Sequence, residues 1–385
     1  MRIVYIVPRY HQNMIATMKG WKDHGDSLCL ITQYCGSVED HSWVEPIVIG
    51  YSWISRFISW IYANTSGKRN PYAKNLNLKY GIPPVHKLAG IFRNFHPDLV
   101  ILRERSLYTI GCFLICRRMH LRVILYNQSP LWAEPGEFKD DISHRIVRRL
   151  TPRYRLTTSH QKGICIDGKI RERYAYFTPF VMGPACAPEN KKYFQNGHIN
   201  IMETGKYEKR KNHFMMVNVF EKLLPDYPEA RLTIVGEAAD RFQREYFDRL
   251  SEYISDHHLE EVIVLKKNLS RAEMGKEYQK ADIFVLPSTG EPASVSIAEA
   301  MAYSIPVIGG TDNGTADYIS DGITGAVFKD KDEKDLFDKM KAMLEDRTVI
   351  MNMGKAAYQD ILDRFQFKDY YATICQIMSD QDRGV

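Results

Sequence analysis

Two glutamates, Glu291 and Glu299, stand eight residues apart, directly after an apolar run that predicts a strand. The first would lie in a loop at the carboxyl edge of a sheet, and the second about one turn into the next helix. Residues 293–296 have mostly small side chains, so free N–H groups at the helix start can approach an oxygen-rich anionic ligand. A glutamate within a helix can also accept two sugar or ribose hydroxyls. The alternative is a solvated Glu291 and a surface ion pair at Glu299.

A second charged group, Lys206 and Lys211, closes one predicted strand and opens a helix. Two cations about one loop apart can clamp a diphosphate, and the helix N-terminus adds to the positive field. Lys206 cannot make the bidentate fork of an arginine, so it would act as a point charge. Because three more charged residues, 208–210, lie between the two lysines, a solvated charge run is the alternative.

These side chains need elements to hold them, and apolar runs alternate with helical stretches along the chain. The predicted strands lie at 2–7, 27–32, 99–102, 122–127, 198–205, 231–236, 262–265, 282–288 and 305–310. Strands that are apolar on both faces and alternate with helices predict doubly wound parallel sheets. Prolines and a glycine between 179 and 198 mark a break. The fold class is therefore α/β, with two Rossmann-like domains at 1–185 and 198–366. Ligands in such sheets bind beyond the carboxyl ends of the strands, so the domains would face each other across one cleft.

Composition and charge restrict the function further. The chain has 385 residues, 44% of them apolar and 26% charged, which is typical of two globular domains and excludes a disordered chain. Residues 1–200 hold 28 Lys and Arg against 14 Asp and Glu, a net charge of +14. The remaining residues hold 24 against 33, a net charge of −9. Halves of opposite sign indicate that they meet different partners.

Several classes of protein are excluded by missing patterns. The seven cysteines form no C-x-x-C pair, which favours reduced thiols over disulfides or a metal site. The start of the sequence lacks a signal-peptide pattern, and no apolar run reaches the ~20 residues of a spanning helix, so we expect a soluble or peripheral protein. No G-x-G-x-x-G follows a strand, which excludes a dinucleotide dehydrogenase. No nucleic-acid-binding signature is present.

One segment of the first half combines aromatic and basic residues. Residues 51–62 place Trp53, Phe57 and Trp60 at helical spacing, with serines and Arg56 opposite. Further basic residues follow at Lys68, Arg69, Lys74, Lys79, Arg117, Arg118, Arg122, Arg145, Arg148 and Arg149. An aromatic and basic face suits an anionic membrane surface. The alternative is a helix packed on the sheet of the first domain.

The order of motifs in the second half resembles the retaining glycosyltransferases of family 4, which have the GT-B fold. The motifs are Glu291 to Glu299, EAMAYSIPVIGG at 299–310, GTADYI at 314–319 and DGITG at 321–325. Gly205-Lys206 and Lys211-Asn212 stand where the family has its G-R/K-x4-K-G/N segment, and Gly236 ends a strand like the family's I-V-G segment. The resemblance is specific over about 200–345 and weak over about 1–180.

The resemblance implies a role for each of these residues. The catalytic set is Glu291, Lys211 and Lys206: the glutamate holds hydroxyls of the donor sugar, and the lysines stabilise the leaving diphosphate without a metal or other cofactor. Glu299 holds the ribose. The donor site is completed by Gly205, Gly236, Lys267, Asn268, Leu269, Pro292, Ala293, Ser294, Val295 and Ser296, with the nucleobase read by backbone groups at 267–269. The helix Phe367–Asp380, within 367–385, crosses back onto the first domain.

The first half departs from the family pattern. Many members have a Gly-Gly loop after the first strand, but the loop here, 8–14, contains no glycine. Many also have a histidine after the strand at 122–127, where this chain has Asn127 and Gln128. Either side chain could hydrogen-bond a sugar hydroxyl, and His11 and His160 are the titratable candidates. We expect His11, Asn127 and Gln128 on the acceptor or donor-sugar side.

The implied reaction moves a sugar, a hexose in our interpretation, from a nucleoside diphosphate sugar to a glycan or lipid-linked acceptor. It belongs to cell-surface polysaccharide synthesis, such as lipopolysaccharide O-antigen, capsule or exopolysaccharide. The expected partners are the nucleotide sugar, the acceptor and an anionic membrane surface, with no nucleic acid. We expect a cytoplasmic chain, peripheral at the inner face of the plasma membrane. The alternatives are a catalytically degenerate GT-B scaffold and a sugar-nucleotide epimerase.

Overall fold

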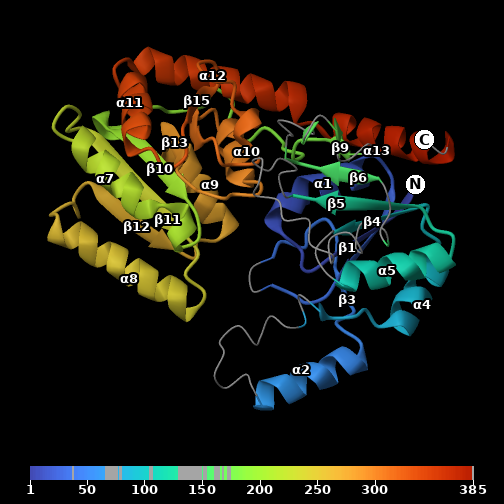
Figure 1. The fold of residues 1–385 in the computed structure, drawn as a ribbon. Helices are drawn as coiled ribbons and strands as arrows, with labels where there is room; N and C mark the ends of the chain where they lie inside the picture. Colours follow the sequence, from blue (N-terminus) through green and yellow to red (C-terminus); the bar gives the residue numbers. More distant parts are fainter. Residues whose placement is uncertain are drawn as a thin grey trace. The chain divides into compact units, whose positions relative to one another are not determined.

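A computed structural model describes residues 1–36, 39–65, 77, 80–103, 107–128, 150, 154–159, 165–166, 169–170 and 175–383. It divides the chain into two compact units, Met1–Val181 with Phe367–Val385, and Met182–Gln366 (Figure 1). Each unit is built on a parallel sheet with helices on its faces. The predicted fold class, α/β with two Rossmann-like domains, is therefore confirmed.

The sheet of the first unit has seven parallel strands in its described part, in the order β3-β2-β1-β4-β5-β6-β9. The strands are β1 (Arg2–Val7), β2 (Ser27–Thr32), β3 (Ile47–Val48), β4 (Leu99–Arg103), β5 (Val123–Asn127), β6 (Arg155–Thr157) and β9 (Ala175–Phe177). A separate antiparallel pair joins β7 (Cys165–Ile166) to β8 (Lys169–Ile170). Successive residues of β1 enter two different core clusters, because both faces of this sheet are covered.

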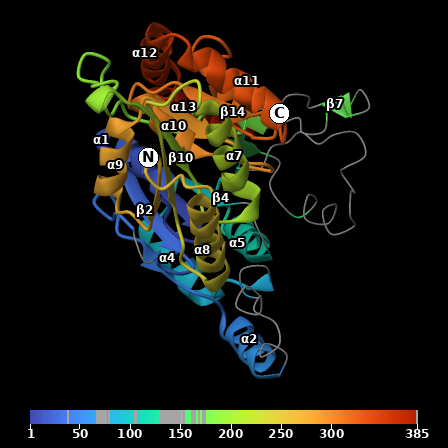
Figure 2. The same ribbon diagram turned by 90° about the vertical axis from the view of Figure 1, so that its left-hand side faces the viewer.

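Helices from both ends of the chain cover this sheet. The residues of α1 (Ile15–Asp23) and α13 (Phe367–Arg383) share one core cluster, and those of α4 (Val85–Phe95) and α5 (Leu107–Arg118) share the other. The hydroxyl of Tyr370 lies 2.6 Å from the hydroxyl of Tyr5, which also accepts a hydrogen bond of 2.8 Å from Trp21. This buried network fixes α13 to the first unit. A further helix, α2 (Trp53–Thr65), lies apart from both faces (Figure 2).

The second unit has six parallel strands, in the order β12-β11-β10-β13-β14-β15. The strands are β10 (Ile199–Thr204), β11 (Ala230–Gly236), β12 (Ile263–Lys267), β13 (Ile283–Leu286), β14 (Val307–Gly310) and β15 (Gly325–Phe328). The helices are α7 (His213–Leu223), α8 (Arg241–Asp256), α9 (Arg271–Lys280), α10 (Val295–Ala302), α11 (Glu333–Leu344) and α12 (Arg347–Arg364). The strand order reverses between β10 and β13, which pair directly, so the loops that follow these two strands emerge side by side.

The predicted strands are confirmed, with ends that differ by a few residues. Some predictions fall outside the described residues, namely those on His160, Lys68, Arg69, Lys74, Lys79, Arg145, Arg148 and Arg149. A search of the described helices found none with the length and apolar character needed to cross a bilayer.

Candidate functional site

The candidate site of the second unit centres on the carboxylate of Glu291. One of its oxygens, Oε2, contacts Nζ of Lys211 and lies 2.6 Å from a guanidinium nitrogen of Arg210. Glu291 and Lys211 are each only 7% exposed, whereas Arg210 is half-exposed and also holds Glu208 at 2.6 Å. Two of the three predicted catalytic residues therefore meet, in the place where the loops after β10 and β13 lie together.

The two loops are tied to each other by the backbone and by one amide. Asn212 adopts a left-handed conformation with φ +56°, and its side-chain amide donates to the carbonyl of Pro287 and to Oγ1 of Thr289. The N–H of Thr289 donates in turn to the carbonyl of Arg210 at 2.9 Å. Gly205 leaves room for the stem of Lys211, since a Cβ there would lie 2.8 Å from it. These contacts thus hold the side chain of Lys211 next to the carboxylate of Glu291.

The electrostatics of the centre favour an ionised Glu291. Burial raises the pKa of this carboxyl, but Lys211 and Arg210 lower it by more, so the pKa lies below its ordinary value. Glu291 is therefore an anion at neutral pH, with acceptor capacity on both oxygens. Such a group can orient hydroxyls, and the two cations beside it can face a phosphate.

Lys206 lies elsewhere on the same loop. Its ammonium group is half-exposed and pairs with Glu237 at 3.3 Å, away from the contacts of Glu291. Arg210, which the sequence reasoning left inside an ambiguous charge run, is the second cation at the carboxylate. The signal that could have identified it was residue type, because arginine presents the planar fork that suits oxyanions.

A buried pair supports the loop from behind, and sequence reasoning missed it. His213 and Glu203 are both fully buried, with Nδ1 of the histidine 2.6 Å from Oε1 of the glutamate. The other ring nitrogen lies 3.0 Å from the carbonyl oxygen of Lys206. Both ring nitrogens thus face oxygen atoms, and the two contacts fix the orientation of the ring behind the loop. A single glutamate and histidine ten residues apart gave no recognisable pattern.

Glu299 lies on α10, and its hydrogen-bond partner differs from the partners of Glu291. It accepts a hydrogen bond of 3.0 Å from the hydroxyl of Tyr278, and burial raises its pKa above the ordinary value. At the start of α10 the hydroxyls of Ser294 and Ser296 are 2.7 Å apart, and the N–H of Ser294 donates to Thr315. Pro292 is exposed, and Ala293 and Val295 are half-buried in the same turn.

The remaining predicted donor residues lie at the ends of β11 and β12. A Cβ on Gly236 would lie 2.2 Å from the carbonyl oxygen of Gly205, so the missing side chain lets the two loops pack together. Asn268, with φ +58°, donates its N–H to Gly236 and accepts from the N–H of Ala238. Lys267 lies over the ring of Phe247 at 4.1 Å, and the exposed Asn268 and the half-buried Leu269 complete this turn.

Among the described residues, no group of three or more His, Cys, Asp and Glu side chains is arranged to hold a metal ion.

The predicted residues of the first unit lie near the ends of β1 and β5. His11 accepts a weak hydrogen bond of 3.4 Å from Arg9, and Gln128 accepts one of 2.7 Å from Arg103, at the end of β4. Asn127 is the last residue of β5.

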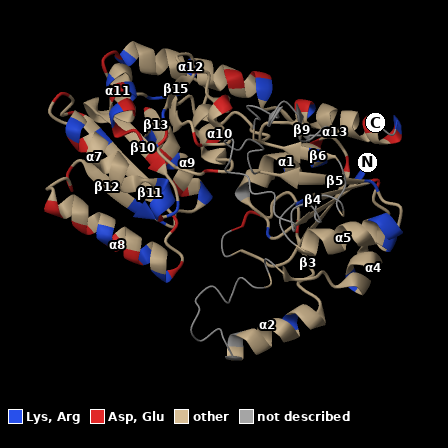
Figure 3. Cartoon of the chain, in the orientation of Figure 1, with Lys and Arg blue, Asp and Glu red and all other residues tan. Residues whose placement is uncertain are grey.

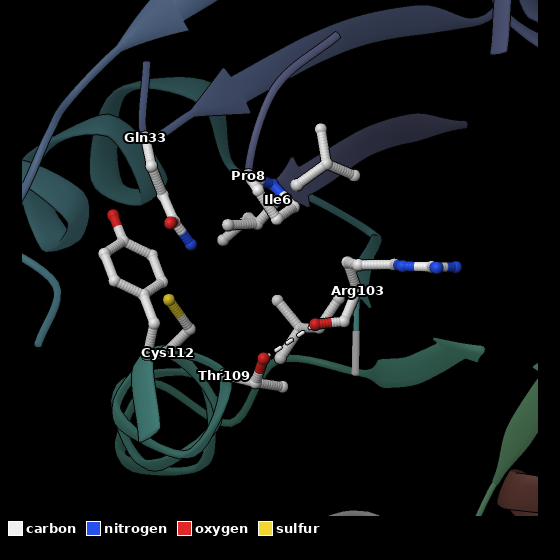
Figure 4. Close-up of a pocket in the computed structure, with 9 residues that line it drawn as sticks. Ile6, Pro8, Gln33, Arg103, Thr109 and Cys112 are labelled. Carbon is white, nitrogen blue, oxygen red and sulfur yellow. Dashed lines mark hydrogen bonds between the residues drawn. The ribbon is translucent and has the colours of Figure 1, made fainter. Parts of the chain in front are cut away.

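A small pocket opens beside Arg103, at the carboxyl ends of β1, β2 and β4, where the strand order of this sheet reverses (Figure 4). Gln33 and Cys112 point into it from opposite sides, and Thr109 donates to the backbone of Arg103 at 2.6 Å. In doubly wound sheets this is where ligands bind.

Comparison with known proteins finds relatives of the second unit. Residues 189–360 match the family model described as glycosyl transferases group 1. Over this range the second unit is similar to group 1 glycosyl transferases. The region that matches a sulfoquinovosyl transferase of Arabidopsis thaliana is 27% identical and covers 42% of this chain and 29% of that protein. A GDP-mannose-dependent phosphatidylinositol monomannoside mannosyltransferase of Mycolicibacterium smegmatis is 25% identical, over 44% of this chain and 45% of that protein. Both matches span less than half of the relative.

The fold of the whole chain is shared with solved structures. An Anabaena protein crystallised with UDP and glucose has a TM-score of 0.71, with 13% identity over 98% of this chain and 99% of that chain. The fold of the chain is therefore GT-B, as the sequence predicted.

Proposed function

We propose that the chain is a glycosyltransferase that takes a hexose from a nucleoside diphosphate sugar. The observation that carries this proposal is the ionised Glu291 held by Lys211 and Arg210, at the switch point of a unit similar to group 1 glycosyl transferases. A carboxylate for sugar hydroxyls beside two cations for a diphosphate is the set of groups that such a donor needs. Two similar proteins, one named as GDP-mannose-dependent and one crystallised with UDP and glucose, support this donor class.

The proposed chemistry retains the anomeric configuration and uses no metal. The acceptor hydroxyl attacks the anomeric carbon from the face of the leaving group, the bond from that carbon to the diphosphate breaks, and a diphosphate oxygen takes the hydroxyl proton. Lys211 and Arg210 stabilise the charge that builds on the diphosphate, and the N-terminus of α10 adds its dipole. Glu291 orients the sugar ring, and Glu299 with Tyr278 faces the ribose.

For the acceptor we propose a glycan or lipid-linked sugar of a cell-surface polysaccharide. The support is the excess of basic residues in residues 1–200 and the name of the mycobacterial relative, whose acceptor is a phosphatidylinositol monomannoside. An anionic acceptor suits a positively charged half. Arg103, which lies beside the pocket in Figure 4, and its hydrogen-bond partner Gln128 would face this acceptor.

A thermal-shift screen with UDP, GDP, ADP, CDP and TDP, without added metal, tests the donor site. A ligand that binds only the folded chain raises the melting temperature, so one diphosphate should stand out. Lys211→Met should abolish that shift, whereas Lys209→Met, an exposed lysine two residues earlier, should keep it. No shift with any diphosphate in a folded sample, or equal shifts in both variants, would contradict the proposal. Proton NMR of the product from the matching nucleotide sugar then reports whether the anomeric configuration is retained.

A further inference from the structure

Helix α2 has the reverse of the usual polarity for a surface helix. Ser55, on its protein-facing side, is buried and accepts a hydrogen bond of 2.9 Å from the N–H of Ile82. The apolar residues point away from the protein: Trp53 is 70% exposed, Phe57 55% and Trp60 63%, and Ile54, Ile58 and Ile61 are also exposed. Because successive helical residues are about 100° apart, these six side chains form one continuous apolar arc opposite Ser55 and Ser59. Helices of globular proteins normally bury such an arc.

The side chains of Trp53, Ile54, Phe57, Ile58 and Trp60 in this arc are all exposed in the described part of the molecule. In both views α2 stands away from the sheet and from the other helices of its unit (Figures 1 and 2). The rings of Phe57 and Trp60 stack on each other, with 6.3 Å between their centroids, and exposed Ile82 is tied to the helix because its N–H donates to Ser55. A contiguous apolar surface of this kind marks an interaction site.

The charged residues in the sequence around this helix are of one sign. Residues 46–97 contain seven Lys and Arg and no Asp or Glu. On α2 itself, which is mostly uncharged in Figure 3, the only charged residue is Arg56. A segment of this composition favours an anionic partner over a basic one, and its exposed apolar side chains favour a partner with an apolar interior.

We propose that α2 docks the first unit on an anionic lipid bilayer. With 13 residues the helix is about 20 Å long, too short to span the hydrocarbon core, so it lies in the plane of the interface. Trp53 and Trp60 sit at the level of the headgroups, Phe57 and the isoleucines reach the acyl chains, and Arg56 meets lipid phosphates. Binding of α2 to the bilayer would bring the enzyme to a lipid-linked acceptor, so this inference rests on the proposed function.

The test is co-sedimentation of the full chain with vesicles of phosphatidylcholine alone and with added phosphatidylglycerol. We expect binding to the anionic vesicles at low salt, with a blue shift of tryptophan emission. Phe57→Ser/Trp60→Ser should lower the partition coefficient more than tenfold, since each buried ring contributes roughly tenfold or more. Arg56→Gln should lower it by about fivefold at low salt and have little effect at high salt. Phe242→Ser, a matched exposed ring on α8, should leave binding unchanged.

Three outcomes would overturn the proposal: no binding of the unmodified chain, equal binding by the Phe57/Trp60 variant, or self-association in solution that the same variant abolishes. The last would assign the arc to a second copy of the chain. Nucleotide binding, measured without vesicles, should be equal in all of these variants. If the unmodified chain binds nucleotide and does not bind vesicles, the result counts against the role of α2 alone. If it binds vesicles and does not bind nucleotide, the result counts against the proposed function.

Discussion

Replacing Glu291 with glutamine removes one negative charge and keeps the size of the side chain. The variant leaves Lys211 buried, at 7% exposure, without a carboxylate partner. Arg210 can turn to solvent and keeps Glu208. Breaking a buried ion pair from one side costs about 3–5 kcal/mol, and because glutamine retains an acceptor oxygen we expect about 3 kcal/mol. For a domain of this size, that lowers the melting temperature by roughly 6–12 °C.

The opposite substitution should cost less. Lys211→Met leaves Glu291 with Arg210 at 2.6 Å, so the buried carboxylate still has a cation, and the loss is about 1–2 kcal/mol. The double variant removes both charges and should be more stable than Glu291→Gln alone. All three variants should lose most of the transfer rate.

The assay separates the two units. All five tryptophans lie at positions 21, 43, 53, 60 and 132, in the first unit, so tryptophan emission follows that unit and far-ultraviolet circular dichroism follows both. The change should appear in the dichroism transition and leave the emission transition in place. Equal costs for the two single variants, or a double variant whose cost is the sum of theirs, would refute the idea that a buried cation governs the stability of this centre.

Two further predictions concern the second unit. His213→Asn should weaken binding of the preferred nucleoside diphosphate in calorimetry more than it lowers the rate at saturation, because the histidine positions the carbonyl of Lys206; a change in neither would contradict this role. Burial lowers the pKa of Lys191 from its ordinary value of 10.5 to about 8, although Asp282 opposes the shift. The unfolded chain therefore binds more protons between pH 8 and 10.5, so this lysine adds stability as the pH rises through that window, by roughly 3 kcal/mol in total. In denaturant titrations across that range, the free energy of unfolding should rise less with pH in Lys191→Met than in the unmodified chain. Equal rises in the two proteins would count against this role of Lys191.

Much of the architecture could be predicted from local patterns in the sequence. The strands at 2–7 and 27–32 are apolar on both faces, which only a sheet covered by helices explains, and the structure matches their ends. Glu291 and Lys211 could be identified because each follows a strand of the same sheet and the carboxyl ends of parallel strands meet. The orientation of α2 could not be predicted, because an amphipathic pattern fixes which residues share a face and leaves open whether that face is covered. Arg210 and His213 act through partners about 80 and 10 residues away, which no local spacing encodes.

The charged side chains around Glu291 pair with one another in this structure. Its carboxylate neutralises a lysine that could not otherwise remain buried, and Glu208 and Glu237 hold the flanking Arg210 and Lys206. A diphosphate that binds here must therefore exchange these partners and cannot simply fill an empty positive site. Arg210 and Lys206 are both half-exposed and can be redirected at low cost, whereas Lys211 is fixed by Gly205 and by the loop that Asn212 ties down. Donor binding should thus depend on Lys211, which sets where the phosphate lies relative to Glu291, and should gain further affinity from the two half-exposed cations.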